Sequence, residues 1–142
     1  MHLEVCSLMY RMELRGGRYV LHEHPMTASS WKEPRISSLE SSPLVFKIRT
    51  DMCAFGMRSK DEKGEGPVLK PTYFLTNGVE LRKARDRRCG GCQRHAHLIS
   101  GRAAAAQVYP KALCHAVVHG IIRQAQHDAA DIMSIDCEGF QR

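Results

Sequence analysis

The stretch Arg18–Trp31, RYVLHEHPMTASSW, decides the expected fold and the position of the candidate chemistry. It opens with the apolar residues YVL at 19–21, continues directly into His22, Glu23 and His24, and is stopped by a proline. An apolar run that ends abruptly in ionisable residues predicts a buried strand with polar side chains at its C-terminal edge. Ligands of open α/β sheets bind at that edge. Glu23 is therefore a candidate hydrogen-bond acceptor for a bound base or sugar. The alternative is an ordinary strand end whose side chains are solvated.

The segments on either side predict one α/β domain over residues 1–130. Apolar residues at helical spacing predict a helix over 1–15, and a Gly-Gly pair would end it. We expect a partial Rossmann-like three-layer fold, with three short adjacent strands, flanking helices and the N-terminal half of the sheet missing. The charged, glycine-rich segment 58–67 is expected to be an exposed, mobile loop, and 131–142 a poorly ordered tail. The expected strands are 18–22, 45–50 and 71–76, and the further helices are 34–41 and 110–127.

Composition favours an intracellular protein, nuclear or cytoplasmic, with an anionic partner. A net charge of +6 and a pI near 9.2 favour nucleic acid such as DNA. No run of 18 apolar residues exists, so no membrane span is expected. The N-terminal sequence does not have the basic residues followed by an apolar stretch that are typical of a signal peptide. Six cysteines without a secretion signal favour reduced thiols. Nothing in the pattern indicates an oligomeric state.

A dense group of metal-ligand residues follows the third expected strand. A Cys-x2-Cys pair and a nearby His pair offer the donor types of a tetrahedral zinc site, and two glycines permit a tight knuckle. Four ligands within nine residues are close together, so Cys114 or His115 could complete the set instead. A thiol-bearing basic loop without metal is the alternative. The four candidate ligands are Cys89, Cys92, His95 and His97.

Three other residues have a less specific pattern. Cys53 follows the second expected strand, where a nucleophile can sit, but no base is visible beside it in the sequence. We therefore interpret it as a semi-buried thiol. His115 and His119 lie one turn apart on the last helix, without the glutamate of the zinc-protease pattern, and are interpreted as ordinary helix histidines.

A basic run before the cysteines is the candidate nucleic-acid surface. Such a run can contact phosphates, and a solvated surface is the alternative. Arg94 and Arg102 lie close by in sequence. The candidate phosphate contacts are Arg82, Arg85, Arg87 and Arg88.

Four blocks in this order resemble a known enzyme family. They are the first helix with RYVLHEHPMTASSW, then TDMCAFGM, then KPTYFLTN, and finally the Cys/His stretch leading to VYPKAL. Over roughly residues 2–123, this order resembles the C-terminal half of the catalytic domain of DNA cytosine-5 methyltransferases. The nearest variants are divergent phage forms and related segments of eukaryotic mobile-element polyproteins, in which Glu-His-Pro replaces the commoner Glu-Asn-Val.

The resemblance implies roles for residues at matching positions. Glu23 would hydrogen-bond the target cytosine and favour protonation of its ring, which assists thiolate attack. His22, His24, Lys70 and Thr72 would lie on the substrate side. The family uses S-adenosylmethionine, but this chain has neither the glycine-rich donor loop nor the Pro-Cys nucleophile motif. Cys53 matches a different block and does not replace that nucleophile.

Three functional hypotheses follow. The first is a methyltransferase-like fragment of a mobile-element or phage-related protein, inactive alone and binding no cofactor, with zinc as the possible exception. The second is a small basic nucleic-acid-binding module stabilised by zinc. The third is a degenerate fragment that folds but has no selected function.

Overall fold

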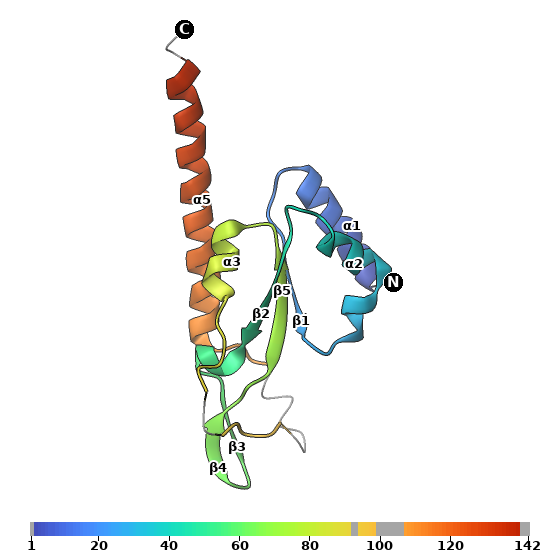
Figure 1. Cartoon of the computed structure of the whole chain (residues 1–142), viewed down its shortest axis with the longest axis vertical. Helices are drawn as coiled ribbons and strands as arrows, with labels where there is room; N and C mark the ends of the chain where they lie inside the picture. Colours follow the sequence, from blue (N-terminus) through green and yellow to red (C-terminus); the bar gives the residue numbers. More distant parts are fainter. Residues whose placement is uncertain (1, 92–93, 99–106, 140–142) are drawn as a thin grey trace.

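The computed structural model describes residues 2–91, 94–98 and 107–139, which form a mixed α/β fold (Figure 1). Helices flank both faces of a small sheet, so the expected α/β class with its three layers is confirmed. The elements are α1 His2–Arg15, β1 Leu21–Pro25, the 3-10 turn η1 Ser29–Lys32, α2 Pro34–Glu40, β2 Phe46–Asp51, the 3-10 turn η2 Met52–Phe55, β3 Arg58–Asp61, β4 Gly64–Pro67, β5 Pro71–Thr76, α3 Val79–Arg85 and α5 Lys111–Gly139.

The main sheet has the strand order β1-β5-β2, and both pairings are antiparallel. The three expected strands are therefore adjacent, as predicted. The first begins at Leu21 rather than at residue 18, because the chain is still entering the sheet there and the Val20 N–H is bound by the Asn77 side chain at 2.9 Å. β1 and β2 run in the same direction on either side of β5. Their C-terminal ends, Pro25 and Asp51, therefore lie at one edge of the sheet.

The side chains of β1 alternate between the two faces of the sheet, and each face is covered by its own hydrophobic core. On one face of the sheet, His22 and His24 contact the ring of Trp31 in a cluster covered by α1 and α2. On the other face, Phe74 packs with Met52, Phe55 and Leu113 of α5. Since successive strand residues point to opposite faces, Glu23 lies on the face opposite its two histidine neighbours.

The last helix packs on α3 and is longer than expected. Gly120 lies where a Cβ would be 3.2 Å from Leu81 and 3.3 Å from Ala84, so its missing side chain allows the close approach of α5 to α3. The helix continues to Gly139 instead of ending at 127, so residues 131–139 of the expected tail are helical. The segment after residue 127 contains no proline, so no residue of that kind stops the helix there. Among the described residues, no helix is long and apolar enough to cross a membrane.

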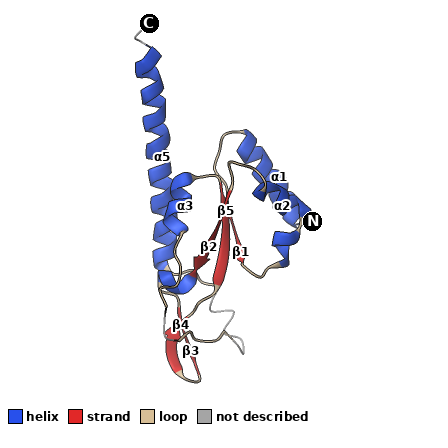
Figure 2. Ribbon diagram, in the orientation of Figure 1, coloured by secondary structure: helices blue, strands red, loops and turns tan. Residues whose placement is uncertain are grey.

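The segment expected to be a mobile loop forms the hairpin β3–β4 (Figure 2). Asp61 and Gly64 pair at the closed end of the hairpin, and Gly64 has a positive φ of 98°, which glycine adopts without steric cost. Arg58 and Glu65 form an ion pair across the strands at 2.7 Å. The expectation of a loop is therefore wrong, because the cross-strand pairing that orders these residues cannot be seen in composition.

Candidate metal centre and the surfaces around it

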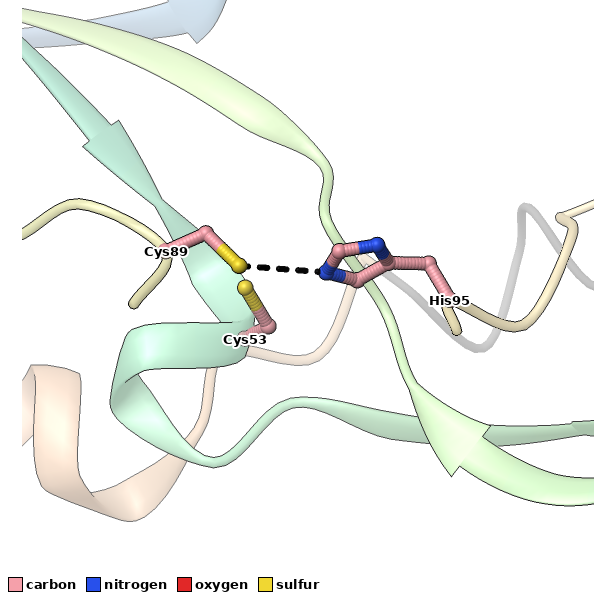
Figure 3. Close-up of side chains that lie close together, drawn as sticks. All are labelled: Cys53, Cys89 and His95. Carbon is pink, nitrogen blue, oxygen red and sulfur yellow. Dashed lines mark hydrogen bonds between the residues drawn. The ribbon is translucent and has the colours of Figure 1, made fainter. Parts of the chain in front are cut away.

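Three segments that are distant in sequence bring Cys53, Cys89 and His95 together (Figure 3). Cys53 lies on η2 directly after β2, Cys89 lies four residues after α3 ends, and His95 lies in the segment 94–98. Their two sulfur atoms and one ring nitrogen all lie within 4.8 Å of one another. The Sγ of Cys89 and the Nε2 of His95 are 3.4 Å apart. All three residues are half-buried.

The position of Cys89 is set by Asp51 at the end of β2. The Asp51 N–H donates to the Arg87 carbonyl at 3.0 Å, and the Cys89 N–H donates to Oδ2 of Asp51 at 2.9 Å. The other carboxylate oxygen, Oδ1, accepts from Arg49, whose Nη2 lies at 3.1 Å. The Asp51 side chain is buried, so these partners provide the hydrogen bonds that a buried carboxylate needs. They hold residues 87–89 against the end of β2, beside Cys53.

The position of His95 is set by the hairpin. Arg94 donates to the Asp61 carboxylate, the His97 N–H donates to the same carboxylate at 3.2 Å, and the Ala96 N–H donates to the Pro67 carbonyl at 2.7 Å. The hydrogen bond from Arg94 lowers the pKa of Asp61 to about 2, against a smaller opposing effect of burial. The carboxylate therefore stays ionised at any physiological pH, and the segment that carries His95 stays attached to β3 and β4.

Two thiols and one imidazole are suitable donors for zinc. In a tetrahedral site, Zn–S is about 2.3 Å and Zn–N about 2.0–2.1 Å, so neighbouring ligand atoms are about 3.5 Å apart. The 3.4 Å between Cys89 Sγ and His95 Nε2 already meets this spacing. Thiolate ligands select zinc over magnesium or calcium. The residues present therefore fit a zinc ion.

Of the four predicted ligands, the structure brings Cys89 and His95 together, in a group that could hold a metal ion. Cys92 lies outside the described residues, and the exposed His97 is not in the group of three. Cys53 takes part instead, although we interpreted it as an isolated semi-buried thiol. It is half-buried as expected, but the imidazole of His95 lies beside it.

The alternative ligands on the last helix do not join this group. Cys114 and His115 are exposed on α5, and so is His119, one turn further along the helix. The group of three therefore forms without a residue of α5.

A pocket of about 760 Å³ adjoins the metal centre. Its walls carry the cationic side chains of Lys47, Arg49 and Arg88, together with Tyr73. Cys89 and His95 line it as well, so the candidate ligands and the cations share one cavity.

On the opposite face of β1, Glu23 is held by a tyrosine from just before α5. The Tyr109 hydroxyl donates to Oε2 of Glu23 at 2.5 Å, and the ammonium of Lys70 lies 5.7 Å from the centroid of the Tyr109 ring. Burial and the hydrogen bond to Glu23 raise the pKa of Tyr109 above its ordinary value. Thr72 is buried, and its hydroxyl donates to the Lys70 carbonyl at 3.2 Å. Glu23 and Lys70 thus lie near one tyrosine, while the Thr72 hydroxyl is engaged by backbone.

The two histidines beside Glu23 are packed into the core of the other face. His22 is buried, with its Nδ1 2.9 Å from the Tyr10 hydroxyl, and its ring stacks on His24 with centroids 4.7 Å apart. Burial lowers the pKa of His22 to about 4, with smaller contributions from the charges of His24 and His2. His24 Nδ1 lies 2.6 Å from Ser30 Oγ. These contacts are those of packed core histidines.

The basic run divides into exposed residues and one buried residue. Arg82, Arg87 and Arg88 are exposed, as a phosphate-binding surface requires. Arg85 is fully buried: its Nη1 donates to the Leu81 carbonyl at 2.9 Å, and its guanidinium lies 5.2 Å from the Phe74 ring centroid. Burial lowers its pKa to about 10. The expectation that Arg85 contacts phosphate is therefore wrong, because the helical period turns this position of α3 inward.

No protein-family model, curated protein or solved structure matches this chain. Functional inference therefore rests on the geometry of the metal centre, the pocket beside it and the exposed arginines.

Proposed function

We propose that this chain is a small zinc-stabilised module that binds nucleic acid through a basic surface. The observation that carries the proposal is the convergence of Cys53, Cys89 and His95 from three separate segments. Two independent anchors, Asp51 and Asp61, place the loops that bear these ligands. A ligand group held by outer hydrogen bonds is the usual construction of a protein zinc site.

Zinc would act here as a cross-link between the sheet, the segment after α3 and the loop that follows the hairpin. Because the ligands come from segments brought together only by folding, zinc binding would add to the stability of the folded chain. A fourth ligand would complete the tetrahedron. The exposed His97 is the described member of the predicted set that can be tested for this role.

The nucleic-acid part of the proposal is supported by charge and exposure. The chain carries a net charge of +6, and Arg82, Arg87 and Arg88 stay exposed on and just after α3. The guanidinium groups of Arg82 and Arg87 lie 4.7 and 4.9 Å from the ring centroids of Phe46 and Phe55. Contacts to phosphate would dominate, so binding should depend on salt more than on sequence.

The first experiment measures zinc in the purified chain and in matched variants. We expect about one zinc per chain, and at least a tenfold weaker affinity in Cys53→Ser and His95→Ala, because each loses one ligand. Cys114→Ser removes an exposed cysteine outside the group and should keep the wild-type affinity. His97→Ala tests the fourth ligand. An unchanged zinc affinity would leave His97 outside the site, and a weaker affinity would make it a ligand. Equal zinc affinity in wild type and Cys53→Ser would refute the site.

The second experiment measures duplex DNA binding against salt concentration. Replacing Arg82, Arg87 and Arg88 together by alanine should reduce the slope of log affinity against log salt by up to about three units if each contacts a phosphate. Arg85→Met is the matched control, since its side chain is buried. Equal slopes in wild type and the triple variant would identify the arginines as ordinary solvated surface.

A second candidate function is a fragment of a cytosine-5 methyltransferase-like domain. It is supported by the position of Glu23 at the C-terminal end of β1, beside Tyr109 and near Lys70. In that function Glu23 would release Tyr109 to bind a cytosine. The donor loop and the Pro-Cys motif of the family do not occur in this sequence, so we expect no methyl transfer from labelled S-adenosylmethionine to DNA. Labelling above that of Glu23→Ala would overturn this expectation.

A further inference from the structure

We propose that the pocket beside the metal centre binds a nucleoside 5′-phosphate, either as a free nucleotide or as one unit of a single strand. The proposal deepens the nucleic-acid function above and rests on it. The pocket lies between β2, β5 and the residues Arg88, Cys89, Gly91 and His95, on the face of the sheet opposite Glu23. It is therefore separated by the sheet from Glu23 and its partner Tyr109.

The strand register builds one wall of the pocket. Lys47 and Arg49 are two apart on β2 and therefore point to the same face, and Arg49 lies opposite Tyr73 of β5. Arg88 enters from the segment after α3, which Asp51 holds in place. The volume of about 760 Å³ is in the usual range for small-molecule sites, about 300–1,000 Å³.

The cationic side chains of the pocket have N–H donors available for an anion. Arg49 bonds one oxygen of Asp51 and the Cys89 N–H bonds the other, so this carboxylate is already engaged by two partners. A guanidinium has five N–H donors, and Arg49 uses two of them on Asp51. Arg88 is half-exposed and lies 3.8 Å from Asp86, a separation and exposure at which an ion pair is weak. A phosphate can therefore bind both arginines.

The aromatic side chains favour a nucleotide over a simple anion. The Lys47 ammonium lies 4.4 Å from the ring centroid of Trp31 and 4.7 Å from that of Tyr73, and it pairs with Glu40 at 2.7 Å. The lysine is thus held at the aromatic wall rather than free in solvent. Tyr73 and Leu69 line the cavity together. Tyr73 is the aromatic residue of the lining, and an aromatic ring beside arginines can stack a base while its phosphate is bound.

Zinc and the nucleotide would be coupled, because the candidate ligands Cys89 and His95 line this pocket as well. A metal that fixes the Cys89 backbone also fixes the neighbouring Arg88. We therefore expect nucleotide affinity to fall when zinc is removed.

The test uses the zinc-loaded full chain and uridine 5′-monophosphate as the probe, measured by calorimetry. Uridine and inorganic phosphate are the comparison ligands, and a ten-nucleotide thymidine strand tests the strand source. Arg88→Glu and Tyr73→Leu should each weaken binding of the monophosphate at least tenfold. Lys111→Glu reverses an exposed charge on α5 outside the pocket and should leave it unchanged. Thermal unfolding of each variant shows whether it is folded.

Tighter binding of the thymidine strand than of the monophosphate would assign the site to single strands, and the reverse would assign it to free nucleotides. Binding of inorganic phosphate as tight as that of the monophosphate would overturn the nucleotide assignment, and so would equal effects of Arg88→Glu and Lys111→Glu. Binding of duplex DNA distinguishes the pocket proposal from the nucleic-acid binding proposed above. If Arg82→Glu lowers the salt slope on duplex DNA while the monophosphate does not bind, only the pocket proposal fails.

Discussion

His22 should make the stability of the zinc-free protein fall as the pH falls. Its imidazole is 5% exposed, and its Nε2 has no hydrogen-bond partner among the described residues. Burial first, and then the charges of His24 and His2, lower its pKa from 6.5 to about 4. The unfolded chain therefore binds a proton on this residue at a pH where the folded chain does not. Stability is complete above the unfolded pKa of 6.5 and is lost as the pH falls towards 4.

The size of the effect follows from the two pKa values. Between pH 8 and pH 5 the unfolded imidazole gains nearly a full proton, while the folded imidazole stays largely neutral. One pKa unit corresponds to about 1.4 kcal/mol, so the free energy of unfolding should decrease by about 2 kcal/mol over this range. Asp61, with a pKa of about 2, stays ionised throughout and adds nothing in this window.

Urea unfolding of chelator-treated protein at several pH values measures this decrease without the contribution of metal release. His22→Gln should be less stable than wild type at pH 8, since Tyr10 loses its imidazole partner. Its free energy of unfolding should, however, change little between pH 8 and pH 5. His119→Gln, which removes an exposed histidine from α5, is the matched control and should keep the wild-type slope. An NMR titration midpoint for His22 near 6.5, or equal slopes in wild type and His22→Gln, would refute the reasoning.

Three further predictions concern the metal centre and the buried arginine. Asp51→Asn should weaken zinc affinity by about 10–100-fold in a chelator competition, because its carboxylate holds the backbone of Cys89, and an unchanged affinity would remove Asp51 from the site. Arg85→Met should keep or raise stability to urea and leave DNA binding unchanged, because the buried guanidinium has two nitrogens without a hydrogen-bond partner among the described residues. Iodoacetamide should modify Cys114 with or without zinc, but Cys53 and Cys89 only after chelation, as peptide mass spectrometry would show; equal labelling in both states would contradict zinc ligation.

The sequence predicted those elements that depend on local pattern. The helical spacing of apolar residues before Gly16 predicted α1, and Pro34 correctly marked the start of α2. The apolar runs at 45–50 and 71–76 predicted β2 and β5 within one residue. The hairpin at 58–67 could not be predicted in this way, because its order depends on the contact between Asp61 and Arg94, 33 residues away.

The ligands of the candidate metal centre could likewise be predicted only in part from the sequence. Cys89 and His95 lie six residues apart and could be recognised from their spacing, but Cys53 lies 36 residues before Cys89, so no ligand spacing links them. The available cue was positional, because Cys53 directly follows β2 at the sheet edge where polar residues were expected. Spacing rules find ligands that share a loop, whereas ligands joined by strand order become visible only when the sheet is known.

The end of β2 links the metal centre to the proposed nucleotide pocket. One oxygen of Asp51 accepts from the Cys89 backbone and the other from Arg49, and the next residue but one is the candidate ligand Cys53. A change at this carboxylate should therefore disturb the metal and the pocket together, whereas loss of Arg88 should disturb only the pocket. If Asp51→Asn weakened zinc affinity but left nucleotide affinity intact, Arg49 would be held by contacts other than this carboxylate. The two sites would then be neighbours without energetic coupling.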